Sequence, residues 1–241
     1  MSDGIKRRDF IRGTSILAGT AAATALASRP VLAQATGPSG VKPATYEIKP
    51  LSVDPKSIKG LSEKILVSHY ENNYSGAVKR LNAITAQLAE LDYATAPVFM
   101  INGLKREELI ATNSMILHEI YFDSLGSGGA PKGAFATAIA RDFGSIERWR
   151  TEFSAIGKAE GGGSGWVILA YSPHDKRLVN QWAADHMTTI AGGRPLLVLD
   201  MYEHAYHMDY GAKAAGYVDA FMEAIHWENA AKLYDRASHE A

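Results

Sequence analysis

The feature that most constrains this chain is a short apolar run that ends in an aspartate and is followed closely by a histidine. Residues Pro195 to Leu199 have the length and composition of a buried strand, which ends at Asp200, and Glu203 and His204 follow it. An aspartate and a histidine placed four residues apart beyond a strand end can converge on one point. There they either form a hydrogen-bonded structural pair or ligate a metal ion. Because such residues near strand ends usually cap turns or bond the backbone, the spacing alone favours the structural pair.

Two predicted helices each carry one further histidine on an apolar face. The first helix starts at Ser62, a residue type that caps helices, and carries His69. Asn102-Gly103 is expected to break the helical pattern, and a second helix over residues 106–125 carries His118. Two long helices joined in this way predict an antiparallel hairpin. A single histidine on an apolar face is usually a core residue, but two on facing helices are able to join the aspartate–histidine pair.

The remainder of the chain predicts a second, mixed region. A turn-rich stretch at 126–131 separates it from the hairpin. Helices are expected at 135–143, after Ser145 and at 217–234, and short strands at 166–171, 177–182 and 195–199. The predicted fold class is therefore α+β, with an N-terminal antiparallel helical hairpin domain (61–126) and a C-terminal domain (132–241) that combines a three-stranded antiparallel sheet with helices.

The first 35 residues have the layout of an export signal. A basic stretch (6–12) precedes a charge-free apolar stretch (13–27), and small residues near position 35 offer a cleavage site. The apolar stretch is shorter than the roughly 20 residues of a spanning helix. The paired Arg7 and Arg8 favour a twin-arginine (Tat-like) signal peptide at 1–35 over an ordinary Sec signal or a retained anchor. Since Tat export carries folded proteins, this predicts a periplasmic or secreted protein that takes up its cofactor before export.

The composition of the mature chain excludes several classes of function. Removal of residues 1–35 takes away five basic and two acidic residues, which leaves twenty basic against twenty-four acidic residues and a formal charge of −4. We therefore expect no nucleic acid partner and no membrane association after signal removal. The chain has no cysteine, which excludes disulfides, thiolate metal ligands and thiol nucleophiles. Residues 36–60 are rich in Pro, Gly, Ser and Thr and predict an extended leader.

Separated motifs along nearly the whole mature chain occur in the order of one enzyme family. They are the run Asp200 to Tyr206, the segment Gly163 to Trp166, the segment Ile225 to Asn229, His69-Tyr70 with Arg80 to Asn82, and His118 with Tyr121-Phe122. They resemble the Asp-x-Trp-Glu-His-Ala-Tyr, Gly-Ser-Gly-Trp and Asn-Trp-Glu segments and the two helix motifs of the iron/manganese superoxide dismutases. The resemblance implies the metal-dependent disproportionation of superoxide to oxygen and hydrogen peroxide.

The resemblance also implies a metal site built from the residues singled out above. It assigns the ligands to His69, His118, Asp200 and His204, with one iron or manganese ion per chain. It assigns Glu203 to a bridge that reaches across a homodimer to the metal-binding histidine of the second copy. Independently, neutral imidazoles with one carboxylate suit iron or manganese, and zinc accepts similar ligands.

Several positions depart from the family pattern. The family's active-site tyrosine on the first helix falls at Ala77, and the histidine four residues before it falls at Asn73. The glutamine that bonds the metal-bound solvent falls at Ser114 or at Gly162, and neither residue replaces an amide. Three functions therefore stay open: a superoxide dismutase with an unusual environment, the same fold and metal with weak or different redox activity, and a non-enzymatic dimeric metal-binding protein.

Without that tyrosine, another residue has to supply protons. The candidates are His207, Tyr202, which replaces the family's tryptophan, and Tyr74. We expect His207 to act, because it follows His204 by three residues and imidazole titrates near neutral pH. An imidazolium there would also attract the superoxide anion. The alternative is that His207 bonds across the dimer, as the family's tyrosine does at this position.

Overall fold

The computed structural model describes residues 40–161 and 163–240, and the predicted signal peptide lies outside them. The chain divides into two units, Met1–Gln34 and Ala35–Ala241. All the elements below belong to the second unit, so the predicted boundary at 126–131 separates two parts of one compact body. Within the described ranges, no helix has both the length and the apolar character needed to span a membrane.

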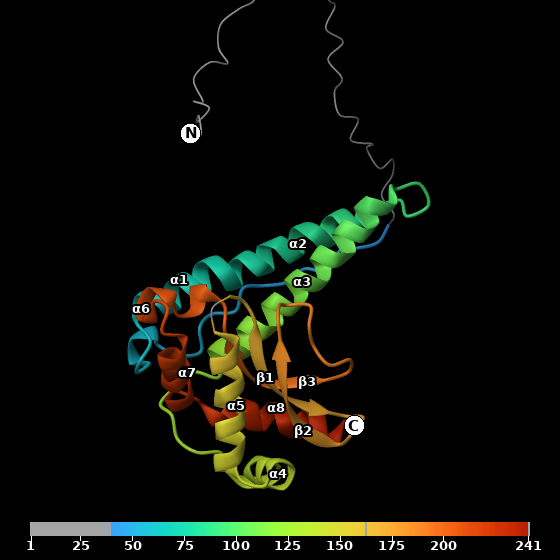
Figure 1. Cartoon of the computed structure of the whole chain (residues 1–241). Coiled ribbons are helices and arrows are strands. Elements are labelled where there is room, and N and C mark those ends of the chain that lie inside the picture. The colour runs from blue at the N-terminus through green and yellow to red at the C-terminus, as the bar shows by residue number, and fades with distance from the viewer. Residues whose placement is uncertain (1–39, 162, 241) are drawn as a thin grey trace, which may run out of the picture. The chain divides into compact units, whose positions relative to one another are not determined.

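Two antiparallel arms form the predicted helical hairpin. The first arm comprises α1 (Glu63–Ser68), a π-helical turn (His69–Tyr74) and α2 (Ser75–Glu90), and the second arm is α3 (Val98–Asp123). α2 and α3 lie side by side along their length (Figure 1). Ser62 caps α1 as predicted, because its Oγ accepts a hydrogen bond from the backbone N–H of Ile65 at 3.1 Å.

The second arm is longer than predicted, since α3 begins at Val98 rather than at residue 106. Pro97 occupies its N-cap, where the missing N–H costs no helical hydrogen bond. Asn102-Gly103 therefore lies inside the helix, and the predicted break there is wrong. An interior glycine costs about 1 kcal/mol relative to alanine. Packing of α3 along α2, with Leu104 against the core, offsets that cost.

The predicted three-stranded antiparallel sheet is confirmed. Its strands are β1 (Trp166–Ser172), β2 (Arg177–Ala183) and β3 (Arg194–Asp200), in the order β2-β1-β3. The central strand β1 is buried along its whole length, as its unbroken apolar sequence requires. Trp166 pairs with both Ala183 and Asp200, so the start of β1 meets the ends of both neighbouring strands. This end of the sheet carries part of the candidate site.

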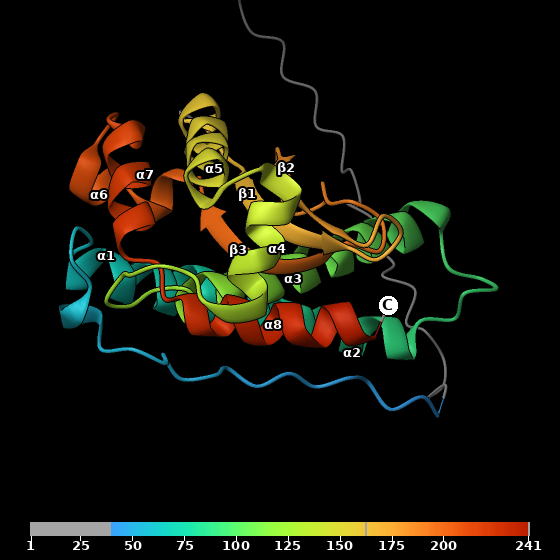
Figure 2. The ribbon, with the colours of Figure 1, turned by 90° about the horizontal axis from the view of Figure 1, so that it is seen from below.

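Helices from the hairpin and from the C-terminal part of the chain cover the sheet (Figure 2). The C-terminal ones are α4 (Gly133–Phe143), α5 (Ile146–Glu160), α6 (His207–Tyr210), α7 (Ala214–Glu223) and α8 (Trp227–His239). α4 contacts β2, and α5 contacts β1 and β2, whereas α3 packs against β3 and α8 against β3 and β1. Ser145 caps α5 as expected, through a hydrogen bond from the backbone N–H of Arg148 at 3.0 Å.

The single C-terminal helix predicted at 217–234 is in fact two helices. The chain leaves helical geometry between them because its backbone pairs with the end of α3. Gly126 donates its N–H to Ala224 at 2.8 Å, and His226 donates to Ser124 at 2.7 Å. These bonds to a distant segment replace the helical ones, which a periodicity analysis of the local sequence does not detect.

The segment before α1 is extended apart from a short 3-10 turn at Pro55–Ser57. It runs along the hairpin, as the blue segment of Figure 2 shows. Tyr46 and Asn82 exchange two hydrogen bonds across this contact, at 2.8 and 2.9 Å. The predicted leader is therefore attached to the helices over its described part.

Candidate metal centre

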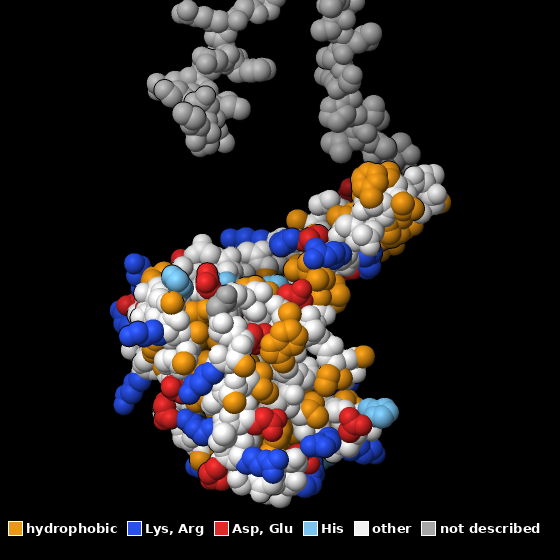
Figure 3. Space-filling model, viewed as in Figure 1, with side chains coloured by type: hydrophobic (Ala, Val, Ile, Leu, Met, Phe, Trp, Pro, Cys, Tyr) orange, Lys and Arg blue, Asp and Glu red, His pale blue; other side chains and the backbone are white. Residues whose placement is uncertain are grey.

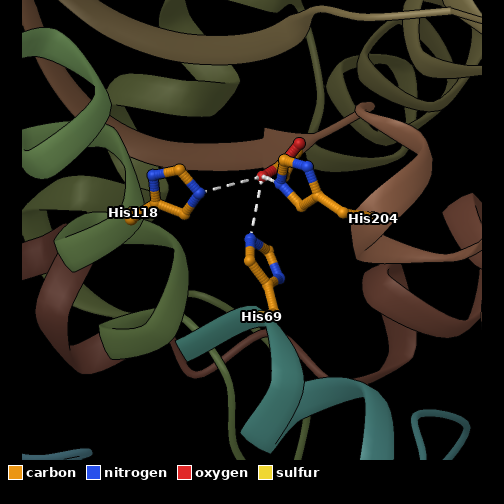
Figure 4. A group of neighbouring side chains, drawn as sticks. His69, His118 and His204 are labelled. Carbon is orange, nitrogen blue, oxygen red and sulfur yellow. Dashed lines mark hydrogen bonds and ion pairs between the residues drawn. The ribbon is translucent and has the colours of Figure 1, made fainter. Parts of the chain in front are cut away.

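The first arm, the second arm and the segment around the end of β3 bring four potential ligands together (Figure 4). His69 begins the π-helical turn, His118 lies on α3, Asp200 ends β3, and His204 lies in a 3-10 turn at Glu203–Ala205. One ligand atom from each residue lies within 4.8 Å of the corresponding atoms of the other three. The cluster therefore lies where the hairpin meets the sheet, and α3 packs against β3 at this junction.

The three imidazoles converge on a single carboxylate oxygen. The Nε2 atoms of His69, His118 and His204 lie 3.0, 3.5 and 3.2 Å from Oδ2 of Asp200. Asp200, His69 and His118 are almost completely buried, whereas the side chain of His204 is 27% exposed. The site is thus enclosed on the helix and sheet sides, and His204 marks the side on which it approaches solvent.

The surroundings favour neutral imidazoles at His69 and His118 and an ionised carboxylate at Asp200. Burial lowers the pKa of His118 to about 3, and burial likewise lowers the pKa of His69. For Asp200, burial by itself raises the pKa, but the neighbouring imidazoles of His204 and His69 outweigh it and hold the pKa well below its usual range. The cluster therefore offers three imidazole nitrogen donors and one anionic oxygen.

A hydrogen bond on α3 fixes the orientation of His118. Its Nδ1–H donates to the backbone carbonyl of Ser114, one turn earlier, with an Nδ1–O distance of 2.6 Å. This bond selects the tautomer in which Nε2 carries a lone pair directed into the cluster. Ser114, at one of the two positions where the family pattern has a glutamine, thus holds a ligand in place through its backbone.

The donor atoms fit a bound metal better than a network of hydrogen bonds. Among the described residues, Nε2 of His69 and Nε2 of His118 are buried and have no hydrogen-bond partner, although both lie within ion-pair distance of Asp200. Leaving buried polar atoms unpaired is costly. A metal ion about 2.0–2.2 Å from each donor separates neighbouring donors by about 3–4 Å, which matches this spacing. The donor types suit iron, manganese or zinc.

An aromatic layer lies beside the cluster and contains a histidine that the sequence patterns did not single out. The ring of Trp166 meets the ring of His118 edge-on at a centroid distance of 5.1 Å, and its Nε1–H donates to Nδ1 of His186 at 3.0 Å. His186 also stacks on Tyr202 at 4.8 Å, and Tyr202 stacks on His204 at 5.3 Å. Burial lowers the pKa of His186, which favours a neutral ring.

His186 was missed because it lies in an irregular loop beyond β2, where no periodicity or motif surrounds it. The one available signal was its position three residues after a strand whose end pairs with the start of β1. Gly162, the other position where the family pattern has a glutamine, lies outside the described residues.

The three proposed proton donors lie in different surroundings. Tyr74 is buried, and its hydroxyl accepts a hydrogen bond from the backbone N–H of Lys49 at 2.9 Å and donates to Oε1 of Glu119 at 3.1 Å. Tyr202 lies in the aromatic layer beside His204. The side chain of His207 is exposed and makes no hydrogen bond or ion pair within the described part of the chain. Their roles in proton supply stay predictions.

The side chain of Glu203 is exposed and has no partner among the described residues. It follows Tyr202 and precedes His204, on the side where the cluster approaches solvent. Its predicted bridge to a second copy is therefore sterically accessible and stays a prediction.

Comparison with known proteins places these observations in one family. Residues 131–233 match the family model of the iron/manganese superoxide dismutases, C-terminal domain. The chain is 73% identical to the iron superoxide dismutase of Cupriavidus metallidurans over 192 residues, which cover 80% of this chain and 98% of that protein. It is 34% identical to a manganese superoxide dismutase of Halobacterium salinarum (80% and 96% covered) and 32% identical to the iron superoxide dismutase of Aquifex aeolicus (80% and 93% covered). With this identity along the chain, and with three histidines and one aspartate gathered in a buried cluster, the chain belongs to the iron/manganese superoxide dismutases.

Proposed function

We propose that this protein disproportionates superoxide to oxygen and hydrogen peroxide, with one iron or manganese ion per chain held by His69, His118, Asp200 and His204. The observation that carries the proposal is the convergence of three imidazoles on one ionised carboxylate, with Nε2 of His69 and Nε2 of His118 buried and without a hydrogen-bond partner among the described residues. The 73% identity to an iron superoxide dismutase supports the reaction.

A bound iron or manganese ion would accept an electron from one superoxide and give it to a second. The chain's own residues then have three tasks. Asp200 supplies a negative charge that balances the cation, and the bond to Ser114 orients His118. Burial of three of the four ligands excludes water on the helix and sheet sides. Small anions would approach on the side where His204 is partly exposed.

Elemental analysis and activity measurements on the same preparations test the proposal. We expect about one iron or manganese per wild-type chain, together with a metal-dependent rate of superoxide removal. His118→Ala removes one of four ligands and is expected to lose most of the metal and the rate. His174→Ala, at an exposed histidine of the β1–β2 turn, serves as a control and should retain both. Full metal occupancy in His118→Ala would rule out this site.

A second function is favoured by the residue at position 77. Ala77 is buried and has no proton to donate, and it occupies the position of the family's active-site tyrosine. The same fold and metal would then support only weak dismutation or a different redox activity. The rate per bound metal separates the two functions. If metal-loaded wild type removes superoxide no faster than free metal does, the second function stands, and if it binds no metal, a non-enzymatic role stands.

We further propose that two copies form a homodimer in which Glu203 of one copy bonds His204 of the other. The exposed carboxylate next to a partly exposed ligand supports this arrangement. A two-fold interface would repeat the contact twice, and the bond would hold each imidazole in one tautomer. Sedimentation and metal retention of Glu203→Ala test the bridge, and unchanged values for both would refute it.

We propose finally that residues 1–35 direct export to the periplasm or beyond. In support, the match to the Cupriavidus protein covers 98% of that protein but only 80% of this chain, so about a fifth of this chain has no counterpart there. Replacement of Arg7 and Arg8 by lysine should retain the protein in the cytoplasm in a cell-fractionation experiment. Normal export of this variant would exclude the twin-arginine route.

A further inference from the structure

Residues 44–50, which we call the strap, are hydrogen-bonded to the first arm of the hairpin at several points. At one end, Thr85 donates its hydroxyl to the carbonyl of Ala44 at 2.9 Å. In the middle, Tyr46 exchanges two backbone-to-side-chain bonds with Asn82. At the other end lies Lys49. The strap thus follows α2 toward the π-helical turn that carries the ligand His69.

Lys49 is the point at which the strap reaches both ligand-bearing helices. Its backbone N–H donates to the hydroxyl of Tyr74 at 2.9 Å, and its carbonyl accepts from the hydroxyl of Tyr70 at 2.8 Å. Its ammonium group forms an ion pair with Glu119, the residue after the ligand His118. The Tyr74 hydroxyl donates to the same carboxylate. One residue therefore connects the π-helical turn to α3 beside both ligands.

An aromatic side chain connects this hydrogen-bonded cluster to the ligand itself. The ring of Phe122 lies 5.8 Å from the ring of Tyr70 and 6.3 Å from that of Tyr74, measured between centroids. The same Phe122 ring lies 5.0 Å from the imidazole of His69. The Phe122 ring therefore contacts both tyrosine rings and also the imidazole of the ligand His69.

The π-helical backbone that begins at His69 needs stabilising contacts from outside the turn. π-helical turns are rare, since their wider hydrogen-bonding ring is less favourable than an α-turn, and they occur frequently at functional sites. This one ends at Tyr74, whose side chain is buried and whose hydroxyl makes the two bonds described above. Burial raises the pKa of Tyr74 to about 12, so its hydroxyl remains able to donate at neutral pH.

We propose that Tyr74 is a positioning residue for the metal centre: anchored by the strap and Glu119, it holds the π-helical turn and Phe122 so that His69 points at Asp200. The inference rests on the proposed function only in that it takes His69 as a ligand. It also gives part of the leader at residues 36–60 a role in the site, because the strap supplies the anchor.

The experiment compares two nearly isosteric variants, each of which removes one hydroxyl of the first arm that bonds the strap. Tyr74→Phe removes the bonds beside the ligands, and Thr85→Val removes the bond at the far end of the strap. In protein loaded with manganese or iron, we measure the rate of metal release to excess EDTA and, for iron, the visible absorption of the bound ion. Tyr74→Phe is expected to release metal about fivefold faster and to shift the absorption, whereas Thr85→Val should stay within about twofold of wild type.

A second readout needs no metal. In the metal-free full-length mature chain, Tyr74→Phe should increase amide hydrogen exchange at residues 69–75 and 118–122 but not at 82–88. Lys49→Arg, which keeps a cation for Glu119, should resemble wild type, and Lys49→Met should lie between wild type and Tyr74→Phe. Equal metal release and equal exchange in Tyr74→Phe and Thr85→Val would overturn the proposal. Failure of wild type to bind metal would refute the proposed function instead, and the exchange measurement would still decide whether Tyr74 holds the turn.

Discussion

Glu160 ends α5 with its carboxylate against the turn at Gly165, where it leaves no room for a Cβ atom. Both carboxylate oxygens are buried and have no hydrogen-bond partner among the described residues. Burial raises the pKa of Glu160 to about 8, and the charge of Asp200 adds to this shift. The nearby backbone N–H of Trp166 opposes it, although its geometry is not that of a hydrogen bond. The ionised form of this glutamate should therefore lower the free energy of unfolding by a measurable amount.

The sign of the penalty follows from proton linkage. Below about pH 4.5, Glu160 is protonated in both the folded and the unfolded chain, so it makes no difference to stability. Between about pH 4.5 and 8 the unfolded chain loses this proton while the folded chain retains it, so stability falls as pH rises. The difference between the two pKa values corresponds to about 5 kcal/mol. Although both carboxylate oxygens are buried, the residue as a whole is only partly buried, so we reduce this to about 1–2 kcal/mol for solvent screening.

Glu160→Gln removes the ionisable group at nearly constant shape. The glutamine amide carries its own cost in a site without partners, but that cost does not depend on pH. We therefore expect Glu160→Gln to gain about 1–2 kcal/mol relative to wild type between pH 4 and pH 9, with most of the gain complete by pH 8. Denaturant unfolding at pH 4, 6, 8 and 9 measures it, and Glu47→Gln, at an exposed position, provides the matched charge control. A wild-type-to-variant difference that is the same at pH 4 and pH 9 would refute the reasoning.

Three further predictions concern packing, the aromatic layer and the metal. Gly157→Val should destabilise the fold by about 1–3 kcal/mol in denaturant unfolding, because a Cβ there would lie 2.9 Å from Cδ2 of Leu199 and 3.2 Å from Cγ2 of Val218; unchanged stability would mean that β3 and α7 adjust freely. Trp166→Phe removes the bond to His186 and should lower the rate of superoxide removal per bound metal, while metal content stays near wild type. An unchanged rate would show that the position of His186 is unimportant. Removal of the metal with a chelator should lower the midpoint of thermal unfolding, since a ligand at a hundred times its Kd adds about 2.7 kcal/mol to the free energy of unfolding. Equal midpoints with and without metal would argue against binding to the folded state.

Local sequence patterns were sufficient for most of the elements. The serines at positions 62 and 145 cap helices where they were expected to, because a cap depends on residues three positions apart. The uninterrupted apolar run of β1 likewise predicts a buried strand from neighbouring residues alone, and the strands β2 and β3 were predicted beside it. The misplaced boundaries have non-local causes. α3 extends across Asn102-Gly103 because α2 packs along it, and the C-terminal helix divides because the backbone near residue 225 pairs with the end of α3.

The sequence by itself identified the four candidate ligands, because the motifs that contain them resemble those of one family in order along the chain. The spacing of Asp200 and His204 alone favoured a structural pair instead. Only the tertiary structure decided what surrounds the four ligands. His186 and Phe122 reach the cluster from a loop and from a helix face through ring contacts. Lys49 bonds the π-helical turn through its backbone and pairs with Glu119 on α3 through its ammonium group. Such contacts join residues far apart in the chain and depend on the packing of whole elements. The orientation of each imidazole is likewise a property of the folded chain, because it is set by which group each ring nitrogen meets.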